Sequence, residues 1–357
     1  MISFAERGSM TNFETRPKLA RETSLWSKVS IGSFGLGLVL VASMALAGPL
    51  PVVGGPLLPL VGTMPEGTWA KVSSNLFSDV WTPPELRPLN HLSNPTPASI
   101  ILPWSGFGWD TRRGDLIIYG GGHANYSGND VYRWHASSLL WERASLPSEI
   151  TQIYTSNGYM AIDGTDAAPA SAHTYDNDIY LPIIDRFLTL GGGLYNTGGP
   201  YIRADEVTPG AVRTTGPYLF DPDRANGNEV GGTTGSHVQR VAPHPEILGG
   251  RMWQNRDLTK NRPSDAKPTK YGMGCTAYAE ENGADVVYIG ATGGGGTNLD
   301  LFRYQITDAA DPTTDSMSKV GRFWYGTAGQ TSCAYDPFRK LFVRTGSNTR
   351  ALRFKQY

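Results

Sequence analysis

The chain has 357 residues, of which 43 are Gly and 25 are Pro, and its formal net charge is −1. This content of Gly and Pro is high for a helical protein and suits many short strands joined by tight turns. The 17 Tyr, 12 Phe and 9 Trp residues argue against disorder beyond about the first sixty residues. Because Lys and Arg form no stripe or basic tail, the composition disfavours nucleic acid as a partner.

The N-terminus has the pattern of an export signal. A basic stretch ends at Lys28, and an apolar run follows over Val29–Leu46, before the small-x-small sequence Ala45-Leu46-Ala47. A run of about 18 apolar residues also fits a retained membrane anchor, but its glycines and its Ala-x-Ala ending favour cleavage. We therefore predict a signal peptide over residues 1–47 and an exported protein, periplasmic or extracellular, that touches a membrane only if the signal stays uncleaved.

The rest of the chain divides into a linker and a repetitive domain. Residues 48–66 are rich in Pro and Gly and are predicted to form the linker. In residues 67–357 each unit opens with a short strand that ends in an aromatic residue, at Gly106–Asp110, His173–Asp176, Cys275–Tyr278 and Cys333–Asp336. An apolar strand, mostly ending in Gly, follows at 116–122, 187–193, 286–293 and 341–346. A third strand is predicted at 131–134, 218–220, 301–304 and 352–354, and the first unit adds a fourth at 139–145.

The pattern predicts an all-β fold of four-stranded antiparallel sheets. Each predicted strand is either wholly apolar or alternates between apolar and polar residues. Strands of this kind belong to sheets that pack face to face on their neighbours. A single sheet of this kind cannot bury both faces, whereas several sheets arranged around an axis bury them and protect their edges. We therefore predict a β-propeller. A β-sandwich is the alternative, although its strands would not repeat with the same apolar-Gly-Gly ending.

Two irregularities leave the number of blades open at four or five. Residues 222–268 make one interval about twice as long as a blade, so they are either a long insertion or a degenerate blade. The chain ends at Tyr357 before a fourth strand of the last unit. Residues 67–73 resemble the fourth strand of the first unit and are expected to pair with the last unit and close the ring; a truncated propeller is the alternative.

Apolar strands with a double glycine, followed by spaced aromatic residues such as Trp134 and Trp141, resemble the kelch repeat. Over roughly residues 99–357 the chain is similar to the kelch-type propeller of the galactose oxidase central domain. That resemblance implies a fold and says little about activity. The copper-radical chemistry of the oxidase is disfavoured, because the sequence has no Tyr-His dipeptide and its cysteines occupy repeat positions. We predict no cofactor.

The candidate site lies in the loops that open on the face where the first strands begin. The first loop, residues 120–130, carries His123 and Tyr126, and the second, residues 191–216, carries Tyr201 and Arg203. His173 begins the predicted first strand of the second unit, so it is expected near the axis on the same face. More ordinary roles compete with this one: His123 as a cap of its glycine turn, His173 as channel wall, and Tyr201 and Arg203 as plain loop residues.

These residues suit β-elimination on a uronate polysaccharide. Arg203 would hold the substrate carboxylate and stabilise the developing enolate, while a His or Tyr removes the C5 proton and a Tyr protonates the leaving oxygen. The Gly-Gly-Gly-His sequence at 120–123 is also similar to a loop of secreted propeller polysaccharide lyases, the ulvan lyases among them. The predicted partner is therefore a polysaccharide or surface glycan.

The sequence predicts no metal site, because its six histidines show neither HxxxH nor HxH spacing. Cys275 and Cys333 either pair, as suits an exported protein, or remain buried thiols. Two further alternatives stand beside the exported carbohydrate-recognising propeller. One is a non-catalytic kelch-like module that binds a protein or glycan, and the other is a truncated propeller without activity.

Overall fold

The computed structural model describes residues 56–88, 95–101, 104–121, 126–148, 150–154, 158–161, 167–192, 201–204, 212–233, 247–256, 270–292, 299–323, 331–346 and 353–356. The segment Gly48–Tyr357 forms one compact unit. The predicted signal peptide lies outside the described residues. Among those that are described, no helix is long and apolar enough to cross a membrane.

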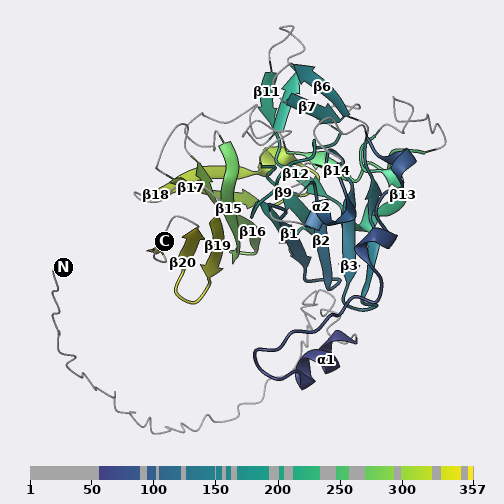
Figure 1. Cartoon of the computed structure of the whole chain (residues 1–357). Coiled ribbons are helices and arrows are strands. Elements are labelled where there is room, and N and C mark those ends of the chain that lie inside the picture. The colour runs from purple at the N-terminus through teal and green to yellow at the C-terminus, as the bar shows by residue number, and fades with distance from the viewer. Residues whose placement is uncertain are drawn as a thin grey trace, which may run out of the picture. The chain divides into compact units, whose positions relative to one another are not determined.

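Strands are the main secondary structure of the described residues, and the larger sheets are antiparallel, as predicted (Figure 1). The first sheet has the order β1 (Phe107–Asp110), β2 (Asp115–Tyr119), β3 (Val131–His135) and β4 (Leu140–Arg143). The second has the order β8 (Asp178–Leu181), β9 (Arg186–Thr189), β12 (Tyr218–Phe220) and β14 (Trp253–Asn255). The third runs through β15 (Lys270–Glu281), β16 (Ala284–Thr292), β17 (Leu299–Ile306) and β18 (Ser316–Phe323). The fourth consists of β19 (Thr331–Asp336), β20 (Leu341–Gly346) and β21 (Arg353–Gln356).

Smaller elements connect and flank these sheets. A hairpin of β6 (Ile150–Tyr154) and β7 (Gly158–Ala161) follows the first sheet, and a hairpin of β10 (Tyr201–Ala204) and β11 (Val212–Thr215) lies between β9 and β12. The strand β5 (Ser145–Leu146) pairs in parallel with β13 (Asn226–Val230). Single 3-10 turns, η3 (Pro222–Arg224) and η4 (Pro312–Thr314), precede β13 and β18.

One prediction about the second unit is wrong, and one alternative that the sequence left open is decided. Its first strand is β8, whereas the predicted strand at His173–Asp176 lies before it and contains Tyr175 at φ 53°, a left-handed conformation that interrupts a regular strand. Residues 222–268 are not a degenerate blade, because their described part supplies β14, the outer strand of the second sheet, together with β13. The long interval is therefore an insertion within the second sheet.

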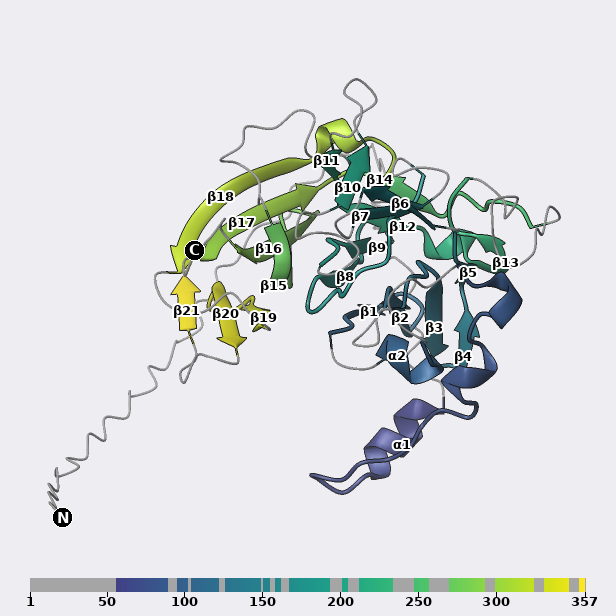
Figure 2. The same ribbon diagram turned by 45° about the horizontal axis from the view of Figure 1, so that its top comes forward.

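Successive sheets pack face to face through apolar side chains. One cluster joins the first sheet to the second around Phe187 and Trp253, another joins the second to the third around Leu188 and Phe302, and a third joins the third to the fourth around Tyr288 and Phe342. At the inner edge, β1 contacts β8, β8 contacts β15, and β15 contacts β19 (Figure 2). The four first strands thus follow one another in chain order along one side of the stack.

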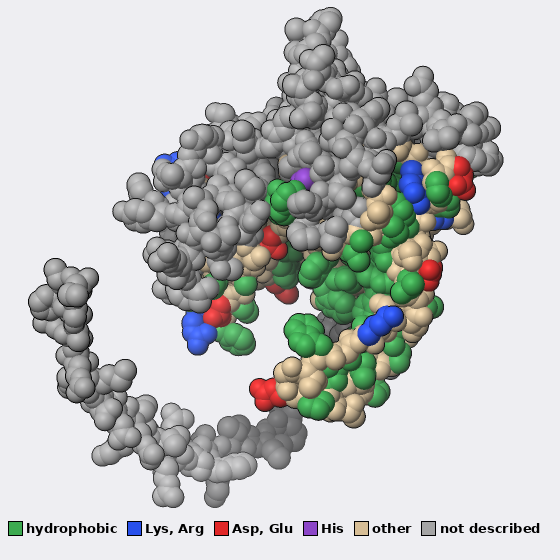
Figure 3. All heavy atoms as spheres, viewed as in Figure 1, with side chains coloured by type: hydrophobic (Ala, Val, Ile, Leu, Met, Phe, Trp, Pro, Cys, Tyr) green, Lys and Arg blue, Asp and Glu red, His purple; other side chains and the backbone are tan. Residues whose placement is uncertain are grey.

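The free face of the first sheet is covered by the preceding segment rather than by another sheet. This segment contains α1 (Leu57–Thr63), η1 (Phe77–Asp79), η2 (Pro84–Leu86) and α2 (Pro97–Ile101). Phe77 and Ile100 pack there against Ile118 and Tyr132. On β1, Phe107 and Trp109 remain 60% and 43% exposed. Figure 3 shows an apolar surface over this part of the molecule.

Within the predicted linker the structure has the helix α1, none of whose residues is buried. One expectation about residues 48–73 is wrong. The stretch 67–73 forms no strand, and its Trp69 is 98% exposed. Instead, Asn75 exchanges two hydrogen bonds with the backbone of Trp141 on β4, at 2.9 and 2.7 Å. The segment therefore attaches to the outer edge of the first sheet, where an amide side chain imitates strand pairing.

Buried charges supplement the apolar contact between the second and third sheets. Arg256, after β14, holds Asp315 through two hydrogen bonds of 2.9 and 2.7 Å, and both side chains are fully buried. Its guanidinium also donates to the backbone oxygens of Asp308, Ala309 and Asp311. A buried ion pair of this kind offsets its desolvation cost only when such additional hydrogen bonds complete it. This joint therefore fixes how the two sheets meet at their outer strands.

A disulfide between Cys275 and Cys333 joins the first strands of the third and fourth sheets, with Cα atoms 5.4 Å apart. Of the two states that the sequence allowed, the structure therefore has the paired one.

Replacing both cysteines by Ser should lower the free energy of unfolding by about 2–4 kcal/mol, because the bond closes a loop with a sequence separation of 58. The measurement is urea denaturation of the wild type and the double variant, each with and without a reductant. The reductant should destabilise the wild type and leave the variant unchanged. Equal midpoints for all four samples would contradict a stabilising disulfide.

Candidate functional site

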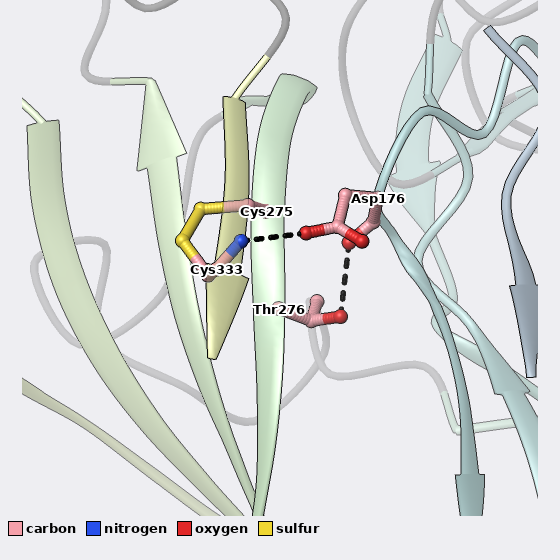
Figure 4. The surroundings of a disulfide bond; sticks show 4 residues. All are labelled: Asp176, Cys275, Thr276 and Cys333. Carbon is pink, nitrogen blue, oxygen red and sulfur yellow. Dashed lines mark hydrogen bonds between the residues drawn. A yellow bond between two sulfur atoms is a disulfide. The ribbon is translucent and has the colours of Figure 1, made fainter. Parts of the chain in front are cut away.

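The segment 171–178 lies where the first strands of the sheets meet, and Asp176 ties it to two of them (Figure 4). Asp176 forms a parallel bridge with Cys275, and its carbonyl oxygen accepts a hydrogen bond of 2.9 Å from the Thr276 hydroxyl. The Asp176 carboxylate accepts a second hydrogen bond of 2.9 Å from the backbone N–H of Cys333. One residue of the second sheet's approach segment thus contacts both cysteines of the disulfide.

Three aromatic rings gather beside this point. The His173 ring lies 5.0 Å from the Trp104 ring and 6.2 Å from the Tyr175 ring, measured between centroids. His173 is 6% exposed, whereas Trp104 and Tyr175 are half-buried. Trp104 and Tyr175 both have positive φ, 80° and 53°, and the N–H of Tyr175 donates to the carbonyl of Trp104 at 2.8 Å. Non-glycine residues in this conformation carry strain and cluster at functional sites.

Two carboxyl groups with raised pKa values accompany the rings. Burial raises the pKa of Asp176 to about 7, against hydrogen bonds from Cys333 and Thr276 that lower it. Burial also raises the pKa of Asp178 to about 7; the hydroxyls of Thr189 and Thr174 lower it, and the charge of Asp176 raises it. Two acids that titrate near neutral pH, side by side in one segment, mark a functional-site candidate on physical grounds.

Glycines let neighbouring backbone pack directly on this segment. A Cβ on Gly192 would lie 1.6 Å from the carbonyl oxygen of His173, and one on Gly120 would lie 2.7 Å from that of Ala172. Both glycines belong to the Gly runs that end the second strands of their units. The runs recognised in the sequence therefore allow the chain to pass against the candidate site.

The structure places the predicted site residues unevenly. His123 lies outside the described residues, and so do the side chains of Tyr201 and Arg203, whose backbone belongs to β10. Tyr126 is fully buried, and its hydroxyl donates to Asp130 at 3.2 Å in a network with Thr82 and Tyr132. Burial raises the pKa of Tyr126 well above its usual value. This hydroxyl has a structural role in the core.

The described ends of the first loop, Gly121 and Tyr126, contact the segment that leads into His173. The N–H of Gly121 donates to the carbonyl of Ala172 at 3.2 Å, and the hydroxyl of Ser171 donates to the carbonyl of Tyr126 at 2.8 Å. These contacts anchor the described residues on both sides of the segment that contains His123. The ordinary role considered for His173, lining the inner wall, also fits its burial.

Sequence reasoning missed Trp104, Asp176 as a tie between sheets, and Asp178. Trp104 lies just before the first strand of the first unit, outside the repeated pattern. The Asp-Asn-Asp sequence at 176–178 was visible, but Asp176 was interpreted only as the end of a strand. Asp178 is the first residue of β8, the first strand of the second sheet, and a buried charged group is unusual at such a position.

No protein-family model matches the chain, and no curated protein matches it. Among the described residues, no group of three or more His, Cys, Asp or Glu side chains is arranged to hold a metal ion. The site is therefore interpreted from its own geometry.

Substituting Ala for Gly192 should displace His173, because the added carbon would overlap its carbonyl oxygen. The expected cost is about 1–3 kcal/mol, seen as a melting temperature lower by several degrees. The control is Gly62→Ala on α1, whose added carbon has no atom within 4 Å and should leave melting unchanged or slightly raised. An unchanged melting temperature for Gly192→Ala would refute the close approach.

Proposed function

We propose that the chain is an exported, kelch-like β-propeller that recognises a carbohydrate at the segment 171–178. Three observations support the architecture: antiparallel sheets with apolar faces, their face-to-face stacking, and contact between their first strands in chain order. The disulfide supports export. Under this proposal the sheets are blades and their first strands line the axis.

The aromatic group around His173 carries the proposal for a carbohydrate ligand. Trp104 and Tyr175 are each partly exposed, and their rings lie near the buried His173 and near each other. Aromatic rings with polar tips offer an apolar surface together with hydrogen bonding, which matches a sugar with apolar C–H faces and hydroxyl edges. The hydrogen bond from the N–H of Tyr175 to the carbonyl of Trp104 ties the two backbones together, so under this proposal the surface is prepared before a ligand arrives.

Binding of polysaccharides should depend on Trp104. The mature chain, beginning at Gly48, would be tested by affinity electrophoresis against uronate and neutral polysaccharides. Trp104→Ala should weaken binding at least tenfold, since stacking on an aromatic face is lost. Trp69→Ala removes a 98% exposed ring far from the site in sequence and should bind as the wild type does. The proposal would be refuted if the folded wild type bound no polysaccharide, or if both variants lost binding equally.

A second candidate function is cleavage of an acidic polysaccharide by β-elimination. The specific observation in its favour is that both described ends of the His123 loop are bonded to the segment that leads into His173. Under this candidate, His173 or His123 removes the C5 proton and Arg203 holds the uronate carboxylate, while the hydroxyl of Tyr201 protonates the leaving oxygen. Tyr126 is not proposed as the acid, because its hydroxyl is buried on Asp130.

Lyase activity should be visible as rising ultraviolet absorbance from unsaturated uronate ends. Of His123→Ala and His173→Gln, the variant that removes the base should lower the rate at least a hundredfold, the usual contribution of a positioned general base. His135→Gln is the matched control, because His135 bonds Asp115 within the first sheet and should keep full activity. With binding intact, the absence of any absorbance rise would leave a non-catalytic glycan-binding module as the function.

A further inference from the structure

The two cysteines of the disulfide have different surroundings. Cys275 is fully buried, and a Cβ on Gly290 of the neighbouring strand would lie only 3.1 Å from its sulfur. Cys333 lies on β19, an edge strand of the last sheet; it is partly exposed, and its neighbours Ser332 and Ala334 are exposed. A thiol in solution therefore has access to the bond from the Cys333 side.

A buried cation lies opposite the more exposed cysteine. Arg344 on β20 is directly opposite Cys333 in the strand register, and it is 1% exposed. Opposite side chains of an antiparallel pair share one face, with Cβ atoms about 5 Å apart. Burial lowers the pKa of Arg344, as expected for a cation removed from water. A neighbouring guanidinium favours the thiolate form of a cysteine, which is the form that reacts.

The same disulfide is connected to the segment 171–178. The N–H of Cys333 donates to the carboxylate of Asp176, and Asp176 also forms a bridge with Cys275 (Figure 4). Two sulfur atoms cannot remain at bonding distance once their bond is broken, so the packing between β15 and β19 changes on reduction. Because Asp176 is held by both strands, this change reaches the segment that carries His173 and Tyr175.

We propose that Cys275–Cys333 is a redox-active disulfide that exchanges with dithiols through attack on Cys333, and that its state sets the position of the segment 171–178. The co-reactant is a dithiol reductant, which the exchange converts to a disulfide. The exchange does not depend on carbohydrate binding, so this proposal and the proposed function stand or fail separately.

The exchange takes place in two steps. A thiolate of the dithiol attacks the sulfur of Cys333, which forms a mixed disulfide and expels the sulfur of Cys275. The second thiol of the reductant then attacks the reductant's own sulfur in the mixed disulfide, and Cys333 leaves as a thiolate beside Arg344. The dithiol loses two electrons and becomes a cyclic disulfide, and the protein disulfide gains them. One thiol proton ends on the sulfur of Cys275 and the other passes to solvent.

Reduction of the folded protein tests the exchange directly. The segment Gly48–Tyr357, which forms one compact unit, is incubated with dithiothreitol at neutral pH without denaturant, quenched with acid and alkylated. Mass spectrometry should count two thiols, while circular dichroism shows that the chain is still folded. If the thiols appeared only after denaturant was added, the disulfide would be structural and the proposal would be wrong.

Two single-cysteine variants determine which sulfur reacts. Cys275→Ser leaves Cys333 as the thiol, Cys333→Ser leaves Cys275, and both variants lack the bond, so they are matched. With an aromatic disulfide reagent and no denaturant, Cys333 should react at least tenfold faster than Cys275, because it is the more exposed and lies opposite Arg344. Equal rates in the two variants would overturn attack on Cys333.

The role of Arg344 is tested in the Cys275→Ser background. Adding Arg344→Met should slow the reaction of Cys333 at least threefold at neutral pH, because less of the thiol is ionised. The control is Arg339→Met, which removes a side chain that is 75% exposed and should leave the rate unchanged. Circular dichroism establishes that each variant is folded. A folded Arg344→Met variant with an unchanged rate would refute the role of the guanidinium.

Tryptophan fluorescence measures the effect on the segment 171–178, because the Trp104 ring packs beside His173. Reduction of the wild type should change the emission, and Trp104→Phe should lose most of that change. Trp69→Phe removes a residue that is 98% exposed and should keep it. Two free thiols without any change in emission would refute the control of this segment by the disulfide.

Discussion

The architecture depends on one constraint: its sheets are apolar on both faces, so each must be covered twice. Three interfaces between successive sheets meet this need for most faces. On the free face of the first sheet, Phe77 and Ile100 from the preceding segment cover the apolar side chains. A chain that must stack its sheets also brings their first strands together, and this gathering creates the setting of the candidate site.

Apolar stacking alone does not fix how the first strands of the sheets meet. Polar contacts fix their positions relative to one another. Asp176 binds the backbone of the third and fourth sheets at once, next to the disulfide that links them. The cost is a carboxyl group so desolvated that its pKa rises to about 7. The segment 171–178 therefore both joins the sheets and carries the carboxyl group with the raised pKa. The residue that joins the sheets is also one that can exchange a proton near neutral pH.

The sequence predicted the strands well because their pattern is local. Alternating apolar residues that end in glycine identify β2, β9, β16 and β20 without any knowledge of tertiary contacts. The second unit misled the prediction, because His173–Asp176 imitates the opening of a repeat. The true counterpart of Trp109 is Tyr180, which lies opposite Phe187 in the next strand as Trp109 lies opposite Leu116. Residue type pointed to Tyr175 as the repeat position, whereas strand register identifies Tyr180.

The candidate site was harder to predict, because its residues come from segments that repeat nothing. Trp104 precedes the first unit, and Asp178 acquires its meaning only once Gly106 and Thr174 lie beside it. A glycine in a strand usually marks a close approach, but the sequence does not say which group approaches. At Gly106 that group is a set of oxygens, and at Gly192 it is the backbone of His173. The glycines at the ends of the repeated strands thus allow polar atoms of the candidate site to pack directly on the sheets. The residues that supply those atoms lie in the segments between the repeated strands.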